Sequence, residues 1–374
     1  MKYIQFSPLY KLEKVNGEKF FIIGRAHKRA YEITESIFFV LKTIEEKGRI
    51  SVSQLINTIS IILNITETDL IKLIKPIILE TLKLGFIIQD KDVENTKFEA
   101  INKYNVGDKI GDYIIKGSIS IRKNTQLYLA AKDDSECVLK IFTGNREKFV
   151  YLKRFRKEFE ILKSLPPHQN IYNLKEYFSS KDLDYGVLDF IKGKSLITSC
   201  EENNYNIKEK LDIVLQIVDS VAHLHKNNIL HGDIHLSNFM KTDQEVKLID
   251  FGFSHLIGNN TENLHGGIPQ FMSPERAKIH TYKFSKTQSS HASEVFQLGI
   301  ILYYVFVKKL PFSGYNWQAL AKSILNDEPN YDLLKDQKIP VKMIDILSKC
   351  LKKDPKERYA NAHDLLISVK KIVQ

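Results

Sequence analysis

The pattern of hydrophobic and polar positions divides the first 88 residues into short strands followed by helices. Three β-rich stretches come first, and Asn16-Gly17 between the first two is a common hairpin turn. From Glu35 the apolar positions recur at spacings of three and four residues, and Gly48 ends that pattern, which predicts a helix. The stretches predicted as strands are Tyr10–Val15, Phe20–Gly24 and Tyr31–Thr34.

Two further helices are predicted before residue 88. One runs from about Ser51 to Leu63. The other begins after Thr66, whose hydroxyl and Asp69 three residues later resemble a capping box. Pro76 lies inside this third helix and predicts a kink there. Three strands followed by three helices predict a winged-helix-like domain over residues 1–88.

The rest of the chain is expected to form a linker and a second, larger domain. Residues 89–104 are polar and without a clear period, which is typical of a linker. Beyond it, a short apolar strand over Val138–Ile141 contains Lys140, and a basic amphipathic helix over Arg146–Leu165 contains Glu158. The chain is therefore predicted to be α+β, with domains over residues 1–88 and 105–374.

Composition and charge are those of an ordinary globular protein. The 374 residues are 43% hydrophobic and 27% charged, which excludes a disordered or collagen-like chain. Cys137, Cys200 and Cys350 lie far apart without a Cys-x-x-Cys pair, so their spacing supports neither a disulfide framework nor a zinc site. The N-terminus lacks a signal-peptide pattern, and the longest apolar runs, such as Leu298–Val307, are about half of the roughly 20 residues that span a membrane. We therefore expect a soluble, cytoplasmic protein that does not enter a membrane.

Several short motifs follow one another in the second domain. After Lys140 and Glu158 come His-Gly-Asp-Ile-His-Leu-Ser-Asn at 231–238, Asp-Phe-Gly at 250–252 and Ser-Pro-Glu at 273–275. In this order and at this spacing they resemble the protein kinase family from about Tyr104 to the end of the chain. The resemblance implies a bilobal kinase fold, with a smaller lobe over about 105–190 and a larger lobe over about 191–374.

The resemblance also implies ATP and Mg²⁺ as cofactors and a role for each motif residue. Lys140 would bind the α- and β-phosphates, held by an ion pair to Glu158, and Asp233 would accept or orient the proton of the attacking hydroxyl. Asp250 and Asn238 would bind magnesium, for which their oxygens are suitable ligands. Two alternatives stay open: a set of unrelated surface and cap residues, or a pseudokinase that keeps the fold as a scaffold.

Two further positions match the family as structural residues. Glu294 replaces the aspartate that anchors the catalytic-loop backbone, and it is one methylene longer. Arg358 matches the late arginine that pairs with Glu275. We expect both contacts in the fold.

The loops around the expected nucleotide depart from the family pattern. The phosphate-covering loop normally contains three glycines, but Ile115–Ile121 retains only Gly117, beside which Ser118 is either a phosphate-binding hydroxyl or a simple loop residue. Gly232 stands where many regulated kinases carry an arginine that binds a phosphorylated activation loop. Activity is therefore expected not to depend on phosphorylation of that loop.

The catalytic loop departs as well. His235 replaces the usual lysine two residues after Asp233, and Ile268 replaces a threonine that cooperates with that lysine. The sequence His-Gly-Asp-x-His is also similar to antibiotic and small-molecule phosphotransferases. His235 is therefore a catalytic candidate at the γ-phosphate, the alternative being a histidine hydrogen-bonded locally. The stretch Phe271–Arg276 is closer to protein kinases and favours a peptide acceptor.

The first domain has a resemblance of its own. The stretch from Tyr31 to Ile87 resembles the PqqD-like domains that recognise leader peptides in ribosomal-peptide modification systems. It shares the apolar positions of Ile37–Ile44, those of Val52–Leu55, and the final Leu-x-Leu-Gly-Phe-Ile. Such a domain would bind an extended peptide at an exposed edge strand. A domain that binds DNA or only packs on its neighbour is the alternative, but residues 1–100 carry 15 Lys+Arg against 13 Asp+Glu, without the dense basic stripe that DNA binding requires.

Most of the formal charge of +10 therefore lies in the second domain. Six basic residues gather around the helix that carries Glu158, and we expect them to face nucleotide phosphates or an acidic peptide. They are Arg146, Lys148, Lys153, Arg154, Arg156 and Lys157.

Together the two halves predict an ATP- and Mg²⁺-dependent kinase that phosphorylates Ser or Thr of a ribosomally synthesised precursor peptide, whose leader binds residues 1–88. The arrangement is similar to lanthipeptide-type pathways, in which phosphorylation prepares the hydroxyl for elimination by a lyase. No lyase or cyclase domain is expected in this chain, so those would be separate proteins. The alternatives are a signalling Ser/Thr kinase, a small-molecule phosphotransferase and a pseudokinase adaptor.

Overall fold

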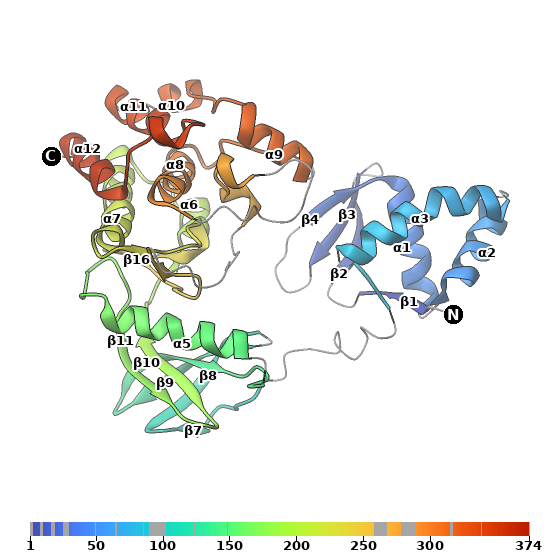
Figure 1. Cartoon of the computed structure of the whole chain (residues 1–374), viewed down its shortest axis with the longest axis horizontal. Helices are drawn as coiled ribbons and strands as arrows, with labels where there is room; N and C mark the ends of the chain where they lie inside the picture. The colour runs from blue at the N-terminus through green and yellow to red at the C-terminus, as the bar shows by residue number, and fades with distance from the viewer. Residues whose placement is uncertain are drawn as a thin grey trace. The chain divides into compact units, whose positions relative to one another are not determined.

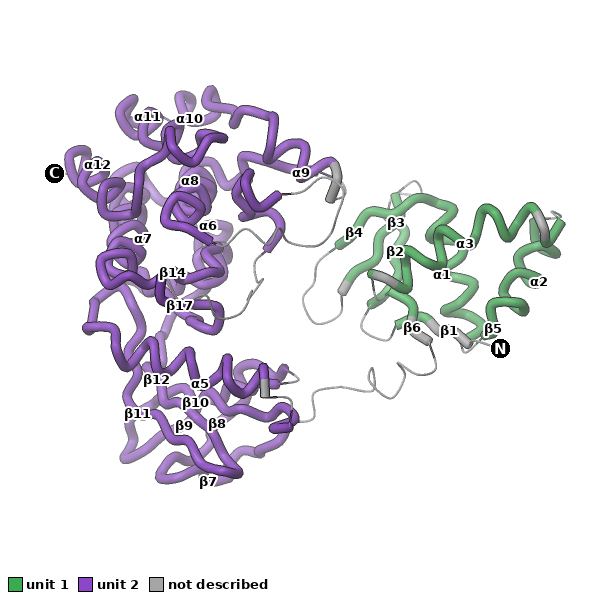
Figure 2. Tube along the Cα trace, viewed as in Figure 1, with its two compact units in different colours: residues 1–101 green, residues 102–374 purple. Residues whose placement is uncertain are grey.

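The computed structural model divides the chain into two compact units, residues 1–101 and residues 102–374 (Figure 2). Most of the predicted linker, residues 90–101, lies outside the described residues. The structure describes residues 3–7, 10–15, 19–24, 30–48, 50–63, 66–84, 86–89, 102–122, 124–147, 149–257, 268–277, 289–314, 317–337 and 339–373.

The first unit contains two small antiparallel sheets and three helices (Figure 1). One sheet has the order β2-β3-β4, made of β2 (Tyr10–Val15), β3 (Lys19–Gly24) and β4 (Ala30–Ile33). The other has the order β5-β1-β6, made of β1 (Tyr3–Phe6), β5 (Ile50–Ser51) and β6 (Ile87–Gln89). The helices are α1 (Glu35–Lys47), α2 (Val52–Leu63) and α3 (Glu67–Lys83). The three predicted strands and three predicted helices are thus confirmed.

Local signals in the sequence explain where these helices begin and end. Thr34 and Thr66 are the N-caps of α1 and α3, and each side chain accepts a hydrogen bond from a backbone N–H in the first turn. Gly48 follows α1 with φ 67°, a left-handed conformation that favours glycine. Helix α3 continues through Pro76 as one helix.

The pattern does not predict β1, β5 and β6, the three short strands of the second sheet. Ile4 pairs with Ile50 on one side and with Gln89 on the other, so both partners lie far away along the chain. The four residues of β1 are too few for an alternation of polar and apolar positions to indicate a strand. The strand is stabilised by these long-range pairings and not by its local sequence. The core beneath the two sheets consists of Ile22, Val40, Leu41, Ile44, Ile50, Leu55, Ile59, Leu70, Ile74, Ile78, Phe86 and Ile87.

The smaller lobe of the second unit is a six-stranded antiparallel sheet with one helix, α5 (Phe149–Ser164). Its strand order is β11-β12-β10-β9-β8-β7. The strands are β7 (Lys109–Ile110), β8 (Tyr113–Ile121), β9 (Thr125–Lys132), β10 (Ser135–Phe142), β11 (Leu174–Ser179) and β12 (Asp184–Asp189).

Helix α5 begins at Phe149, later than the predicted Arg146. Arg146 instead donates to the carbonyl of Ser180 and pairs with the carboxylate of Asp184, which Arg156 also contacts at 2.8 Å. Asp184 is fully buried, so the two arginines neutralise an internal charge. The hypothesis that both arginines face a ligand is therefore wrong.

The larger lobe is mainly helical. Helix α8 (His291–Val307) lies at its centre and is buried from Ser293 to Phe306, which accounts for the long apolar run in the sequence. Helix α12 packs against α7. Among the described residues, no helix is both long and apolar enough to cross a membrane. The other helices are α6 (Leu196–Glu202), α7 (Ile207–Lys226), α9 (Trp317–Asn326), α10 (Asp332–Asp336), α11 (Val341–Cys350) and α12 (Ala362–Val373).

Short strands in this lobe hold the expected catalytic loops. Strands β13 (Lys194–Ser195), β15 (Phe239–Lys241) and β16 (Val246–Leu248) form one small sheet, and β14 (Ile229–Leu230) pairs with β17 (His255–Leu256). The three cysteines are buried and unpaired, as their spacing predicts.

An ion pair joins two distant segments of the larger lobe. Arg358, which is fully buried, donates to Glu275 at 3.0 and 2.8 Å and to the carbonyls of Lys352, Lys353 and Ala292. The expected pairing of these residues is therefore present. Burial alone would raise the pKa of Glu275, but the hydrogen bonds and charge of Arg358 outweigh it, and the net pKa is lowered.

Replacing Arg358 by Met should destabilise this unit by roughly 3–5 kcal/mol, because it leaves the largely buried carboxylate of Glu275 without its cation. Trp317, the only tryptophan of the chain, lies on α9, so urea unfolding followed by its fluorescence reports on this unit. Lys356→Met, at an exposed position nearby, is the control. Because the pKa of Glu275 is lower in the folded protein than its ordinary value of 4.5, the ion pair adds its full contribution to the free energy of unfolding only above about pH 4.5. This contribution is lost as the pH falls through the pKa of the folded protein. The difference between wild type and variant should therefore shrink below about pH 4.5; a loss under about 1 kcal/mol at pH 7 contradicts this role.

Candidate active site

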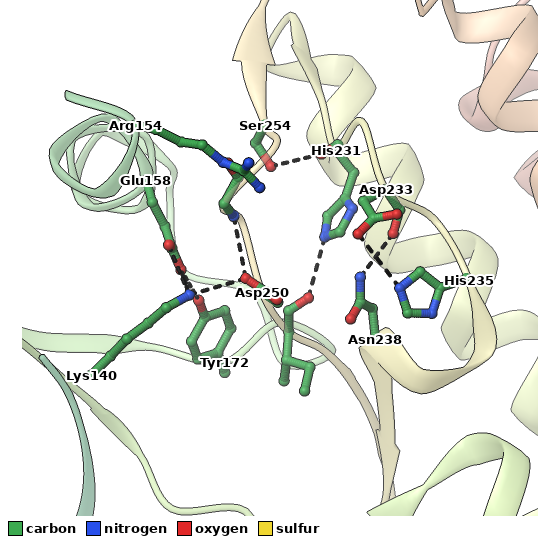
Figure 3. Close-up of polar contacts among 12 residues, drawn as sticks. Lys140, Arg154, Glu158, Tyr172, His231, Asp233, His235, Asn238, Asp250 and Ser254 are labelled. Atoms are coloured by element: carbon green, nitrogen blue, oxygen red, sulfur yellow. Dashed lines mark hydrogen bonds and ion pairs between the residues drawn. The ribbon is translucent and has the colours of Figure 1, made fainter. Parts of the chain in front are cut away.

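Three charged side chains from different elements meet between the two lobes of the second unit (Figure 3). Lys140 on β10 donates from Nζ to both carboxylate oxygens of Glu158 on α5, at 2.6 and 2.8 Å. The same Nζ lies 3.0 Å from Oδ1 of Asp250, which follows β16. One lysine thus joins the sheet, the helix and the start of the activation segment.

Burial and charge act in opposite directions on these groups. Burial would lower the pKa of Lys140, but the carboxylates of Asp250 and Glu158 outweigh it and raise that pKa. The charge of Lys140 in turn holds the pKa of Asp250 far below its usual range, with a further contribution from Arg122. Burial raises the pKa of Glu158 while Lys140 opposes the shift. At neutral pH the lysine is therefore a cation and Asp250 a carboxylate.

The backbone at Asp250 has an unusual conformation that aims its side chain. Its φ is 64°, in the left-handed region that non-glycine residues seldom occupy and that costs energy unless neighbours enforce it. Phe251 is fully buried between the rings of His231, at 5.2 Å, and Tyr172, at 5.7 Å. Tyr172 then donates from its hydroxyl to Glu158 at 3.3 Å. This packing fixes the phenylalanine, and the phenylalanine fixes Asp250.

The catalytic loop between β14 and β15 places three polar residues together (Figure 3). Asn238 donates from Nδ2 to the carbonyl of Asp233 at 2.8 Å. His235 Nδ1 accepts from the backbone N–H of Ser237 at 3.2 Å, and its Nε2 lies 3.5 Å from Oδ2 of Asp233. In a neutral imidazole with Nδ1 accepting, the proton resides on Nε2, which faces the aspartate.

Glu294 on α8 anchors the backbone of this loop, as expected. Its Oε1 accepts from the N–H of Gly232 at 2.7 Å, and its Oε2 lies 2.9 Å from Nε2 of His225. His225 Nδ1 accepts from the N–H of Ala362, so this histidine donates to the carboxylate and ties α7, α8 and α12 together. Burial would raise the pKa of Glu294, but the hydrogen bond from His225 outweighs it and the net pKa is lowered.

The glycine-poor segment near the site is a β-hairpin. Gly117 and Ser118 lie in β8 opposite Leu129 and Tyr128 of β9, with bulges on either side. A Cβ on Gly117 would meet no atom within 4 Å, so the protein itself does not require a glycine at that position.

Three contacts around the site were not predicted from the sequence. Arg122, in the turn after β8, is near enough to Asp250 to lower its pKa, and Tyr172 contacts Glu158. Arg154 contacts the backbone carbonyl of Gly252. Arg154 lies four residues before Glu158, and this helical spacing, which places both side chains on one face, was the available signal.

The residues expected to bind magnesium fit that role by their chemistry. Asp250 is an ionised carboxylate, and Asn238 uses its amide nitrogen internally, which leaves the amide oxygen as the donor toward a metal. Such hard oxygen ligands suit Mg²⁺, which usually takes only one or two of them from the protein. Within the described residues, no cluster of three or more His, Cys, Asp and Glu side chains forms a separate metal site.

Comparison with known proteins gives the class. Residues 117–368 match the protein kinase domain family, so the chain belongs to that family. It is 29% identical over 247 residues to serine/threonine-protein kinase PrkC of Bacillus subtilis, which covers 63% of this chain and 36% of that protein. A probable serine/threonine-protein kinase of Clostridium perfringens is 26% identical over 242 residues, 63% of this chain and 34% of that one. A probable myosin light chain kinase of Dictyostelium discoideum is 29% identical over 265 residues, 68% and 63% of the two chains.

The two bacterial relatives are named as a serine/threonine-protein kinase and a probable one. The matched segment spans about a third of the length of the two bacterial relatives. The family match begins at residue 117, after the first unit, so it does not cover residues 1–101.

Removing the carboxylate of Glu294 should lower the catalytic rate by more than the loss of folded protein explains. Glu294→Ala leaves the Gly232 N–H and His225 without their acceptor, and a shifted catalytic loop should lower kcat by roughly 10- to 100-fold. Glu294→Asp, although it restores the family residue, should lose part of the activity because its shorter side chain does not span both partners. ATP consumption with a Ser/Thr peptide measures the effect, with exposed Glu357→Ala as the control. Full activity of Glu294→Ala would contradict the anchoring role.

Proposed function

We propose that this chain transfers the γ-phosphoryl group of ATP to Ser or Thr hydroxyls of a peptide recruited by its first unit. The observation that carries the proposal is the Lys140–Glu158–Asp250 network beside Asp233 and Asn238, because it assembles the charges that phosphoryl transfer needs. Bound ATP with Mg²⁺ supplies the phosphoryl group and neutralises part of its charge. The protein supplies positioning and electrostatic stabilisation.

Each side chain has a task consistent with its contacts. Lys140, fixed by Glu158, binds the α- and β-phosphates, and Asp250 with Asn238 holds the magnesium. Asp233 orients the acceptor hydroxyl and receives its proton. His235 directs its Nε2–H at the Asp233 carboxylate and keeps that carboxylate oriented, a task that suits a loop without the usual lysine. Gly117 and Ser118 lie in the hairpin that covers the phosphates in this proposal.

The acceptor is a peptide in this proposal. The segment Phe271–Arg276 runs from the end of one short 3-10 turn through a second one before α8, and the Glu275–Arg358 pair holds it in place. In this proposal it forms the rigid surface on which the peptide lies beside the catalytic loop. His235 lies beside Phe271, with 6.1 Å between ring centroids. The names of the matched relatives, which are Ser/Thr protein kinases, support this acceptor over a small molecule.

The first unit is the recruiting part, a winged-helix domain of the PqqD-like type in this proposal. In the sheet β2-β3-β4, β2 and β4 each pair with β3 alone, so both are edge strands within the described residues. Ala30, Tyr31 and Glu32 of β4 are exposed. An edge strand accepts an extended peptide through main-chain hydrogen bonds. The partner is then the leader of a ribosomally synthesised precursor peptide.

Binding the leader raises the local concentration of the attached acceptor hydroxyls. An effective concentration in the millimolar range, about what short flexible linkers give, lets the active site itself be poorly selective. A signalling Ser/Thr kinase is the second candidate, because the bacterial relatives are named as Ser/Thr protein kinases.

The full chain should phosphorylate a short peptide encoded beside its gene when incubated with ATP and Mg²⁺. Mass spectrometry should find a phosphate adduct on Ser or Thr. Deleting the leader, or scrambling its sequence, should reduce the rate by at least 10-fold at micromolar peptide, because the tether is lost. Asp233→Asn is the matched control for phosphoryl transfer and should give no adduct.

Other outcomes separate the alternatives. Efficient phosphorylation of unrelated proteins such as myelin basic protein, with no adduct on any neighbouring peptide, supports the signalling kinase. A leader-independent adduct rejects recruitment by the first unit. Leader binding without ATP turnover, unchanged in Asp233→Asn, indicates a pseudokinase adaptor.

His235→Gln should lower kcat roughly 10-fold, less than the 10²–10⁴-fold typical of a general base itself, because His235 acts through Asp233. The KM for ATP should change little, since His235 is not expected to hold the nucleotide. His235→Lys, which restores the family residue, should recover most of the rate. Exposed His363→Gln is the control. If the KM for ATP rises while kcat is unchanged, His235 contacts the phosphates instead.

A further inference from the structure

Arg154 contacts two consecutive residues at the start of the activation segment. Its Nε donates to the carbonyl of Gly252 at 2.5 Å, and its guanidinium carbon lies 3.3 Å from the centroid of the Phe253 ring. Figure 3 shows the Arg154 side chain reaching from α5 toward this segment. A planar guanidinium makes both contacts at once, which the ammonium of a lysine does poorly.

The backbone of Phe253 lies against Gly232 of the catalytic loop. Gly232 has φ 78°, and a Cβ placed on it would lie 2.4 Å from the carbonyl oxygen of Phe253. The segment therefore occupies the space that any side chain at position 232 would need. This gives a physical reason for the missing arginine: the close approach of the two backbones leaves room only for glycine.

The residues after Phe253 are also held by the unmodified chain. Ser254, which is buried, donates from Oγ to the carbonyl of His231 at 3.1 Å. His255–Leu256 pairs with β14, and the N–H of Ile257 donates to the carbonyl of Asn228 at 2.9 Å. Gly252–Ile257 is thus fixed to both lobes without any phosphate. Residues 258–267 lie outside the described residues.

The position of Arg154 couples this segment to the catalytic charges. Glu158, which orients Lys140, lies four residues later on the same face of α5. Gly252 lies among these groups, since a Cβ on it would be 3.3 Å from Oδ1 of Asp250, 3.5 Å from Glu158 Oε2 and 3.6 Å from Arg154 Nη2. A displacement of α5 would therefore break both contacts together.

We infer that Arg154 is a positioning residue that clamps Gly252 and Phe253 onto α5 and so keeps the activation segment in its working arrangement without phosphorylation. The inference deepens the proposed function and rests on it for the activity measurements. The clamp replaces the missing arginine of the catalytic loop by a contact from the other lobe. In this arrangement the enzyme is active as synthesised.

The test compares Arg154→Met, Arg154→Lys and exposed Lys163→Met, which removes a positive charge from the same helix. Arg154→Met should lower kcat by roughly 10- to 100-fold, as expected for misplaced catalytic groups. Arg154→Lys should recover less than half of the loss, and Lys163→Met should behave as wild type. The melting temperature should differ little among them. An Arg154→Met variant with more than half of the wild-type kcat overturns the inference.

A double-mutant cycle with Phe253→Leu tests the ring contact. If the guanidinium acts through the ring, the double variant Arg154→Met/Phe253→Leu should lose no more rate than Arg154→Met alone. Independent, multiplicative losses overturn the clamp. Between Gly252 and Ser273 the sequence contains two phosphorylatable residues, Thr261 and buried Ser254. Thr261→Ala should retain the wild-type rate, and its inactivation in a folded protein would also overturn the inference.

Hydrogen exchange separates this inference from the proposed function because it needs no activity. In the full chain, Arg154→Met should speed exchange of the Ser254 and Ile257 amides by about 10-fold or more over Lys163→Met, since their hydrogen bonds to Phe251 and Asn228 lose support. Faster exchange in a chain that phosphorylates nothing would reject the kinase function and keep the positioning role. Unchanged exchange in an active chain would do the reverse.

Discussion

The ion pair between Lys140 and Glu158, extended to Asp250, is the interaction on which the arrangement of the second unit depends. A largely buried ammonium next to the buried carboxylate of Glu158 is costly unless the two charges meet within hydrogen-bond distance. Meeting that condition requires β10, α5 and the start of the activation segment to take one relative position. This ion-pair network therefore fixes the position of the smaller lobe and its helix relative to the larger lobe, around the charges that phosphoryl transfer uses.

Neighbouring contacts maintain the same register from other directions. Phe251 packs between His231 and Tyr172, and Tyr172 contacts Glu158. Glu294 holds the catalytic loop through the N–H of Gly232, and Phe253 packs on that same glycine. The departures from the family pattern thus form a consistent set, because a loop with glycine at 232 permits the close packing that a larger side chain would prevent.

The sequence predicted two ion pairs that the structure contains, but it did not predict the surroundings of other charged residues. Lys140 and Glu158 meet as expected, as do Glu275 and Arg358, because family spacing encodes such pairs. The basic cluster around α5 was predicted to face ligands, whereas Arg146 and Arg156 neutralise Asp184 and Arg154 contacts Gly252 and Phe253. Local pattern shows that a residue is charged. It does not show which buried partner lies opposite, since that partner comes from a distant segment.

The sequence by itself determined the periodic elements, the two-part organisation and the order of the kinase motifs, because periodicity, caps and motif spacing are local properties. Tertiary structure alone decided the pairing of β1 with β5 and β6, the contact of His235 Nε2 with Asp233, and the position of Arg154 over Phe253. Each of these joins atoms whose proximity depends on how whole elements pack. Such proximity is fixed by burial and charge summed over the fold, and no short stretch of sequence contains it.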